Sequence, residues 1–484
     1  MSDELTKNSI HSFMWKTMQS ICSLGITFVI QLILARMLMP EDFGLIAIVN
    51  VFMTLANTVV ETSFSSAIIQ RNSISQKMLS SVFFVNIFLS VFLYGVLFLM
   101  APLLSVFYEE EILIPVLRVQ GLRVVISAVY SIQQALMNRK MRFKALFFCN
   151  FAGVVFQAIT GIAMAYCDMG IWALVLSSCV GSAISGFMIC VVEFWVPELY
   201  FSLKSVREAL SFSSKILAIR VIKKIYYNIR VLVIGKIYDA EILGYFNKGL
   251  QFPSTAMTVV DGSLTSVAFT HLSKLQDEKK QFLIALRQYV RCAMFLCTPL
   301  MVGMILIAKP LILFLLTERW IACVPYLQII CLSHLLIPLS IKATAFEALG
   351  RSDISMKLNL TGVFISIVFL FALAKWSPLI MVSGEIFSNF LLQTFIAILA
   401  SKYLQYSIYE QLKDAFCGAP PTAIMACGIF ILDFIDFGNF YLLEILAKIT
   451  AGVFFFVLVS IITKNQVFFD IVGVLKNKIR GKRV

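Results

Sequence analysis

Apolar runs of about 20 residues recur from one end of this chain to the other. Each run is long enough to cross the hydrocarbon of a bilayer as a helix, and in lipid only helices or closed barrels satisfy every backbone polar group. Only 14% of the 484 residues are charged, whereas a soluble protein carries about 25%. The sequence therefore predicts an all-α polytopic membrane protein, and no segment resembles a separate soluble domain.

Breaks between the apolar runs, several of them marked by proline, predict about 14 transmembrane helices. The first run is expected to be retained as a span, because it is too long for a signal-peptide core and no small-residue cleavage site follows it. The expected spans are 11–35, 44–66, 79–101, 113–136, 145–166, 169–192, 209–235, 250–272, 286–308, 322–346, 354–375, 378–400, 414–433 and 440–463.

Lysine and arginine are concentrated in alternate loops. Examples are "NRKMRFK" (138–144), "KLQDEKK" (274–280) and the tail "KNKIRGKRV" (476–484), whereas "FYEEE" (107–111) lies in a loop of the other set. Cytoplasmic loops carry the excess of positive charge, so both termini are expected in the cytoplasm. The net charge of +13 is then explained by topology and by contact with anionic lipid, and nucleic acid is not an expected partner.

The two halves of the chain resemble each other at an offset of 200 residues. "TVVETSFSSA" (58–67) matches "TVVDGSLTSV" (258–267), and the same offset pairs Gly44 with Gly244. Matches in the same order predict two six-helix repeats, which are parallel because each has an even number of spans. We expect an N-terminal six-helix bundle at 1–200, a C-terminal six-helix bundle at 201–405, and two additional helices with a basic cytoplasmic tail at 406–484.

Charged residues inside the predicted spans are the candidates for function. A charge at the centre of a span costs roughly 2.5–3.5 kcal/mol, so such residues usually face water or a partner. In the seventh span, five residues share one arc of the helix opposite a largely apolar side. We expect this cationic stripe to line an aqueous cavity and to bind an anionic substrate. The five are Arg220, Lys223, Lys224, Tyr227 and Arg230, and other basic residues inside spans include Arg123, Arg291 and Lys342.

Other roles for these charges stay open. The cations can instead snorkel or form structural ion pairs, and for Arg123 and Lys342 the sequence favours neither reading. Glu61 and Asp261 occupy equivalent places in the two repeats. They either couple transport to an ion gradient or act as salt-bridge partners of the cavity cations. The cysteines and histidines are scattered singly, so no metal, cofactor or catalytic site is expected.

Several segments resemble a known family of membrane proteins. "LARMLMPEDFGLIAI" (34–48), "LGYFNKGLQFP" (243–253), "THLSKLQ" (270–276), "ERWIACVPYLQII" (318–330) and "EALGRSDI" (347–354) are similar to the Wzx-type polysaccharide flippases of the multidrug/oligosaccharidyl-lipid/polysaccharide exporter superfamily. The resemblance covers most of the chain up to residue 360 and weakens in the last quarter. It implies two six-helix bundles that form a V around a central cavity and work by alternating access.

The resemblance also implies a function. The substrate of such a flippase is undecaprenyl diphosphate carrying an oligosaccharide, which crosses the bacterial inner membrane for O-antigen, capsule or exopolysaccharide export. Its diphosphate suits arginine and lysine. Proton or sodium coupling and association with polysaccharide polymerase machinery are further expectations, and the protein is not expected to be an enzyme.

Two alternatives remain open at this point. One is a cation-coupled multidrug exporter of the same fold, for which an acidic cavity would be expected. The other is a membrane-embedded polysaccharide polymerase or ligase, which commonly carries a large outer loop with catalytic groups. The basic stripe counts against the exporter, and the short outer loops count against the polymerase or ligase. ATP hydrolysis is not expected either, because the sequence lacks the phosphate-binding pattern GxxxxGK[ST].

Overall fold

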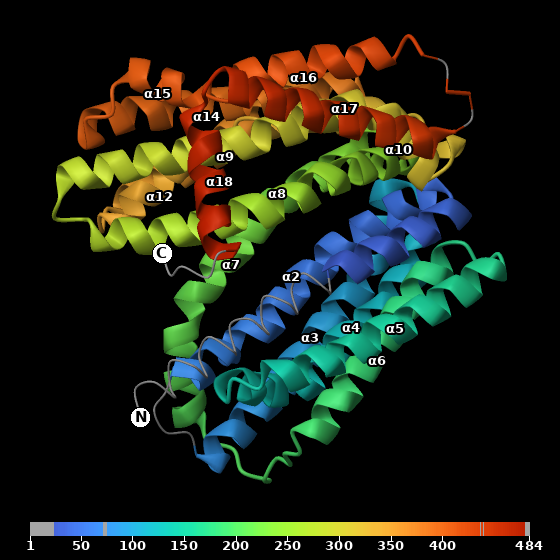
Figure 1. The fold of residues 1–484 in the computed structure, drawn as a ribbon. Coiled ribbons are helices and arrows are strands. Elements are labelled where there is room, and N and C mark those ends of the chain that lie inside the picture. Colours follow the sequence, from blue (N-terminus) through green and yellow to red (C-terminus); the bar gives the residue numbers. More distant parts are fainter. Residues whose placement is uncertain (1–23, 71–74, 436, 439, 480–484) are drawn as a thin grey trace. The chain divides into compact units, whose positions relative to one another are not determined.

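The computed structural model describes residues 24–70, 75–435, 437–438 and 440–479. Within these ranges all regular secondary structure is helical, so the all-α prediction is confirmed (Figure 1). The chain divides into two compact units, Met1–Gly244 and Tyr245–Val484. Each unit has its own buried core and is described by itself.

The first unit is a bundle of long helices. In it α5 packs against α6, α4 packs against α2, α3 and α6, and α7 packs against α2 and α3. Small residues allow the closest of these approaches, since a Cβ on Gly153 of α5 would lie 2.5 Å from the carbonyl oxygen of Gly181 on α6. The helices are Leu24–Met37, α2 (Pro40–Gln70), α3 (Gln76–Tyr108), α4 (Leu113–Arg139), α5 (Phe143–Tyr166), α6 (Ile171–Val192) and α7 (Leu203–Ile237).

A buried carboxylate after α6 binds two cations in the turn between α4 and α5 of the first unit. Glu193, which follows α6, is 5% exposed and forms ion pairs with Lys140 and Arg142 in the turn between α4 and α5. The Arg142 Nη1 to Glu193 Oε2 distance is 2.9 Å. Burial raises the pKa of Glu193, but the hydrogen bonds and charges of the two cations outweigh it, so the pKa lies below its ordinary value. The contact fixes the α4–α5 turn against the end of α6.

The second unit contains the remaining helices. In it α13 packs against α14, α16 against α17, and α11 against both α9 and α14. Its core includes Phe282, Leu286, Phe346 and Tyr406. The helices are α8 (Ala240–Lys274, which starts in the first unit), α9 (Lys279–Leu306), α10 (Ala308–Leu315), η1 (Glu318–Trp320), α11 (Cys323–His334), η2 (Ile337–Ser340), α12 (Ile341–Ala348), α13 (Ser352–Leu373), α14 (Pro378–Leu404), α15 (Ile408–Ala415), α16 (Ala419–Leu432), α17 (Tyr441–Ile462) and α18 (Gln466–Ile479).

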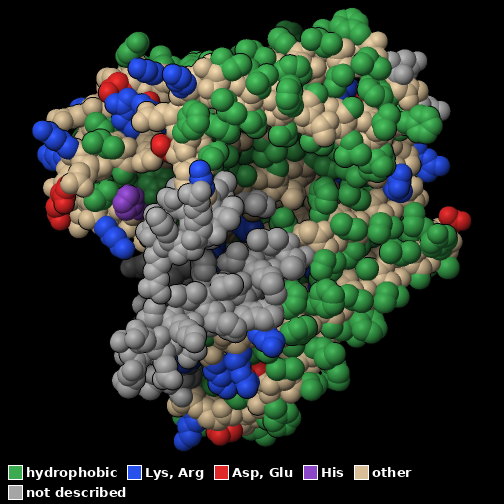
Figure 2. Space-filling view, viewed as in Figure 1, with side chains coloured by type: hydrophobic (Ala, Val, Ile, Leu, Met, Phe, Trp, Pro, Cys, Tyr) green, Lys and Arg blue, Asp and Glu red, His purple; other side chains and the backbone are tan. Residues whose placement is uncertain are grey.

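Helices able to cross a membrane make up most of both units. In the described residues, 11 helices are long and apolar enough to do so. Hydrophobic side chains also cover much of the viewed face of each unit (Figure 2). At the other three expected spans the structure has the shorter apolar helix Leu24–Met37 and the 35-residue helices α7 and α8. The chain is a multi-pass membrane protein, while the count of 14 spans stays a prediction.

The structure contains a reciprocal contact between two positions that the sequence repeat pairs, Gly44 and Gly244. Helix α2 begins at Pro40 and α8 begins at Ala240, the two residues that the offset pairs. A Cβ on Gly44 would lie 1.7 Å from the carbonyl oxygen of Ala240, and one on Gly244 would lie 2.0 Å from that of Pro40. No side chain fits at either position, so both glycines are required for the helix starts to meet. The bundle boundaries at 200 and 405 stay predictions.

Candidate functional site

The cationic stripe lies on a helix that is anchored at one end. The C-terminal third of α7 packs in the first unit, where Val231 and Ile234 are buried. The hydroxyl of Tyr108 donates to the carbonyl oxygen of Leu232 at 3.4 Å, and Lys236 Nζ lies 3.0 Å from Glu109 Oε1. These contacts hold the last turns of α7 in place, and the stripe ends at Arg230, directly before Val231.

The stripe itself is largely uncovered. Arg220, Lys223 and Lys224 are exposed, Tyr227 is 71% exposed, and Arg230 is partly buried. The apolar side of the same segment is also open, since Ile222 is 58% and Ile225 is 45% exposed. This stretch of α7 thus presents two unlike faces. The apolar face suits hydrocarbon, whereas the cationic face requires water or an anion.

Arg123 lies elsewhere in the first unit. Its side chain is partly buried on α4, and its Nε donates to the hydroxyl of Ser182 on α6 at 3.0 Å. This hydrogen bond joins two neighbouring helices, as polar side chains inside membrane bundles commonly do. The structure thus gives Arg123 a contact between helices and does not place it on the stripe.

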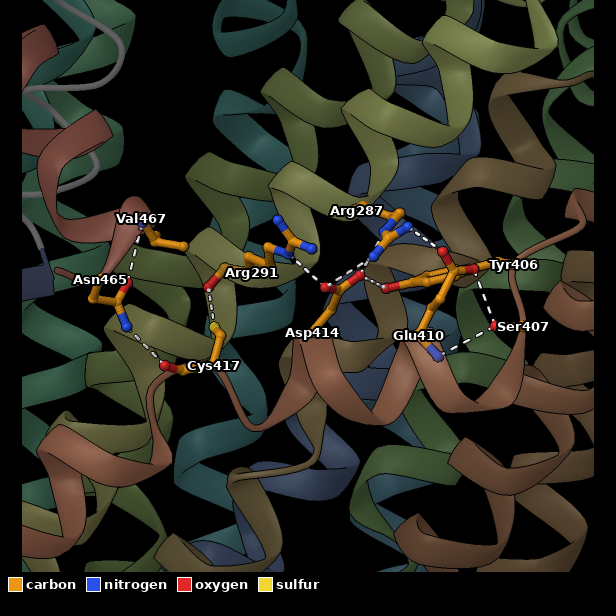
Figure 3. A network of polar contacts seen from close by, with 9 residues as sticks. All are labelled: Arg287, Arg291, Tyr406, Ser407, Glu410, Asp414, Cys417, Asn465 and Val467. Carbon is orange, nitrogen blue, oxygen red and sulfur yellow. Dashed lines mark hydrogen bonds and ion pairs between the residues drawn. The ribbon is translucent and has the colours of Figure 1, made fainter. Parts of the chain in front are cut away.

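Arg291 and Lys342, from distant parts of the sequence, both reach α15 in the second unit. Arg291 on α9 donates from Nε to Oδ1 of Asp414 (Figure 3). Lys342 on α12 is 3% exposed and donates to Oε1 of Gln411 at 3.0 Å. The amide of Gln411 in turn donates to the carbonyl of Tyr406 at 2.8 Å. The two cations therefore help to hold α15 against the second unit.

Asp414 is the centre of this network. It is 1% exposed and also accepts from Arg287 Nε at 2.8 Å and from the Tyr406 hydroxyl at 2.7 Å. Arg287 forms a second ion pair with Glu410, one turn earlier on α15 (Figure 3). The carboxylates of Glu410 and Asp414 thus neutralise the two arginines. Because Asp414 is shared by both arginines, its bonds favour one fixed position of α15 against α9.

The side chains of Glu61 and Asp261 lie outside the described residues. Their backbones belong to α2 and α8, and no contact of either carboxylate is described. Both interpretations from the sequence, ion coupling and salt-bridge partnership, therefore stay predictions.

Residues 33–325 match the family described as "Polysaccharide biosynthesis protein". The chain belongs to this family. It is 23% identical over 433 residues to "Teichuronic acid biosynthesis protein TuaB" of Bacillus subtilis (strain 168), covering 88% of this chain and 89% of that protein. It is 22% identical over 370 residues to "Lipopolysaccharide biosynthesis protein WzxC" of Escherichia coli (strain K12), covering 75% of this chain and 74% of that protein.

Among solved structures, this member of the polysaccharide biosynthesis protein family is similar to "Lipid II flippase MurJ, inward closed conformation". The TM-score is 0.74 at 18% identity, covering 93% of this chain and 99% of that chain. The match shows a shared fold. The family match and the relatives TuaB and WzxC confirm the resemblance to the Wzx-type polysaccharide biosynthesis proteins.

Sequence reasoning missed the residues that surround Arg291. Arg287, Glu410 and Asp414 were not candidates. Arg287 and Asp414 lie at the first residues of the predicted spans 286–308 and 414–433, and Glu410 lies in the loop before the second of these. The signal was present in "IYEQLKDA" (408–415), a short segment with apolar residues on one side and acids on the other. Such a segment is typical of a helix that lies at the border of a bundle and pairs with its charges.

Proposed function

We propose that this protein translocates an undecaprenyl-diphosphate-linked oligosaccharide across the bacterial inner membrane by alternating access. The observation that carries the proposal is the uncovered cationic stripe of α7, which combines Arg220, Lys223 and Lys224 within little more than one helical turn. TuaB is named for teichuronic acid biosynthesis, WzxC for lipopolysaccharide biosynthesis, and MurJ as a lipid II flippase. A lipid-linked glycan is the substrate class that we infer for this chain from these names together.

The charge of the stripe is best matched by a diphosphate. Removing several cations from water into lipid would cost on the order of 10 kcal/mol if nothing compensated them. A diphosphate supplies several negative oxygens, and the planar fork of an arginine binds two of them at once while lysine acts as a point charge. In this proposal Arg220, Lys223, Lys224 and Arg230 bind the diphosphate, and the aromatic ring of Tyr227 lies beside the sugars.

The remaining candidates have secondary roles in the proposal. Arg123 joins α4 to α6 in the first unit, while Arg291 and Lys342 hold α15 in the second. Glu61 and Asp261 either bind the coupling proton or sodium ion or pair with the cations of α7. Both termini are placed in the cytoplasm by the positive-inside rule, and the polymerase that consumes the exported unit is the expected partner machinery.

The basic stripe also separates this proposal from its two rivals. A multidrug exporter that takes cationic drugs requires acids where this protein has Arg220, Lys223 and Lys224. A polymerase or ligase commonly carries its catalytic groups on a long outer loop. The loop between α13 and α14, on the side expected to be outer, has only residues 374–377. Transport of an anionic lipid-linked substrate fits the charge best.

The test is the double variant Arg220→Ala/Lys224→Ala. It is expressed in a strain whose own gene for this protein is deleted, and surface polysaccharide is measured by immunoblot with whole cells. We expect surface polysaccharide to be lost and lipid-linked repeat units to accumulate inside, because the diphosphate is no longer held.

A matched control removes two other cations. Lys279→Ala/Lys280→Ala takes the same charge from the exposed start of α9, and it should leave surface polysaccharide unchanged. Membrane levels of all variants are compared by immunoblot. Wild-type amounts of polysaccharide in the α7 double variant, at normal protein level, would remove the stripe from the mechanism.

A further inference from the structure

The short helix α15 is amphipathic in the opposite sense to a helix on the surface of a soluble protein. Its polar side chains Gln411 and Asp414 are buried in contacts with α12 and α9. Its apolar and aromatic side chains face outward instead. The exposed ones are Ile408, Leu412, Tyr409, which is 77% exposed, and Phe416, which directly follows the helix. In water this arrangement is unfavourable, because apolar area stays hydrated while polar groups are desolvated.

The four exposed side chains share one side of the helix. At about 100° per residue, they fall within an arc of about 100°, which we call the apolar face of α15. The polar residues Glu410, Gln411 and Asp414 fall within a second arc on the other side, and Lys413 lies between the two arcs. One side of α15 therefore packs against the second unit, while the apolar face is turned to whatever surrounds the protein.

Contacts with α9 place α15 at the border of the membrane. Arg287, which binds Glu410 and Asp414, lies about 12 Å along α9 from the start of that helix at Lys279. This start is part of the basic segment 274–280, and the headgroup layer of a bilayer is roughly 5–7 Å thick. In Figure 1, α15 lies at the same end of the second unit as the turn between α8 and α9. α15 thus lies near the level where headgroups meet acyl chains.

Positive charge accompanies the apolar face. Lys413 is exposed beside it, and Lys402 is exposed in the last turn of α14, shortly before α15 begins. The two arginines of α9 are already balanced by the two carboxylates of α15, so the charges of these lysines are in excess. A lysine can lay its carbon chain along apolar surface and keep its ammonium group among headgroups. Tyrosine, as at Tyr409, is likewise typical of the membrane–water interface.

We propose that α15 is an interfacial helix that binds anionic phospholipid on the basic side of the membrane. Its apolar face lies among the upper parts of the acyl chains, and Lys402 and Lys413 contact the phosphates. Because Asp414 is bound by Arg287 and Arg291 (Figure 3), the bound lipid also holds this end of α9 at the bilayer surface. This lipid-binding surface belongs to the second unit and does not depend on the cationic stripe of α7.

Lipid suits the apolar face better than a protein partner does. Exposed apolar side chains continue along the chain on both sides of α15, with Ile398 on α14 and Ile424 on α16. Both helices belong to candidate membrane spans, so lipid already surrounds them. The same lipid reaches α15 without any further partner, and its anionic headgroups complement the two lysines.

The test is photo-crosslinking in the full-length protein. p-Benzoylphenylalanine, which inserts into nearby C–H bonds under ultraviolet light, replaces Leu412. The purified protein is placed in vesicles of equal parts phosphatidylcholine and phosphatidylglycerol, and adducts are identified by mass spectrometry. We expect a phospholipid adduct in which phosphatidylglycerol is favoured at least about fivefold, the preference that one lysine gives near an anionic headgroup.

Two other positions calibrate the measurement. The same replacement at Phe364, which is 69% exposed on α13, should give a phospholipid adduct without a headgroup preference. At Gln276, exposed in the turn between α8 and α9, it should give no lipid adduct. If the Leu412 position resembled Gln276, or if irradiated cells gave an adduct of Leu412 with another protein, the proposal would be overturned.

A charge variant tests the headgroup contact. Lys402→Gln/Lys413→Gln should keep the phospholipid adduct at Leu412 and lose the preference for phosphatidylglycerol. The matched control Lys77→Gln/Lys144→Gln removes two exposed lysines of the first unit and should keep the preference. An unchanged preference in the α15 variant, or equal use of both lipids in the wild type, would contradict anionic binding. No measurement uses the glycolipid, so failure here is distinguishable from failure of the proposed function.

Discussion

At the scale of single residues, the charges of this protein fall into two groups with different fates. On α7 the side chains of Arg220, Lys223 and Lys224 are exposed, while around α15 Arg287 and Arg291 are bound to a buried carboxylate. The sequence could not distinguish the two groups, because Arg230 and Arg291 both lie inside apolar predicted spans. The partners that decide their roles come from other helices.

Asp414→Asn tests the network around α15. The substitution leaves Arg287 and Arg291 with one fewer negative partner in a buried setting, so we expect a loss of about 3 kcal/mol in unfolding free energy. Thermal unfolding of the detergent-solubilised protein measures it. Glu410→Gln serves as the comparison and should cost less, because the Glu410 side chain is 34% exposed. Equal effects of the two variants would mean that Asp414 is not the centre of the network.

Glu193 makes stability depend on pH. Its pKa is lowered in the folded protein, so its ion pairs stabilise the fold above the ordinary value of 4.5, and this contribution is lost as the pH falls through the lowered pKa. Glu193→Gln should therefore cost about 1 kcal/mol at neutral pH, and this cost should shrink as the pH falls below 4.5 and through the lowered pKa. Unfolding temperatures across the pH range provide the measurement. Glu111→Gln, at an exposed position, is the control, and its effect on the unfolding temperature should not depend on pH. If Glu193→Gln lowered the unfolding temperature equally at all pH values, the ion pairs of Glu193 would not be the source of the pH dependence.

At the scale of elements, the length of apolar runs predicted most helices because the thickness of the bilayer fixes it. The interruption of the tenth expected span, 322–346, by η2 was not predicted. Pro338 was visible in the sequence, but a proline inside an apolar run can also sit in a kinked, continuous helix. Whether the helix kinks or breaks depends on whether α9 and α14 provide hydrogen-bond partners for the backbone carbonyl that Pro338 leaves without a donor.

Gly44→Ala tests how α2 and α8 meet. A methyl group at this position would lie 1.7 Å from the Ala240 carbonyl oxygen, and a backbone carbonyl cannot turn aside as a side chain can. We expect a loss of at least about 2 kcal/mol and little folded protein on fluorescence-detected size exclusion. Gly303→Ala is the control, because no atom lies within 4 Å of a Cβ there. Normal yield and stability of Gly44→Ala would show that the two helix starts do not meet in this way.

At the scale of the whole molecule, the sequence predicted the class, the repeat and the family, since hydropathy, spacing and order of motifs are properties of the chain itself. It did not predict where the compact units divide, because the side on which α7 packs is decided by contacts with α2 and α3. Nor did it predict that α15 binds Arg287 and Arg291 of α9 and Lys342 of α12. Both features depend on tertiary contacts between helices, which a single sequence does not reveal directly.

The reciprocal glycines constrain how this chain can have evolved. If one ancestral segment was copied to give both halves, each copy inherited a position whose freedom is limited by the backbone of its twin. Neither Gly44 nor Gly244 can then acquire a side chain unless the opposing helix start moves away. Two sites separated by 200 residues are thereby held to the same amino acid, even where the flanking sequence of the two copies has diverged.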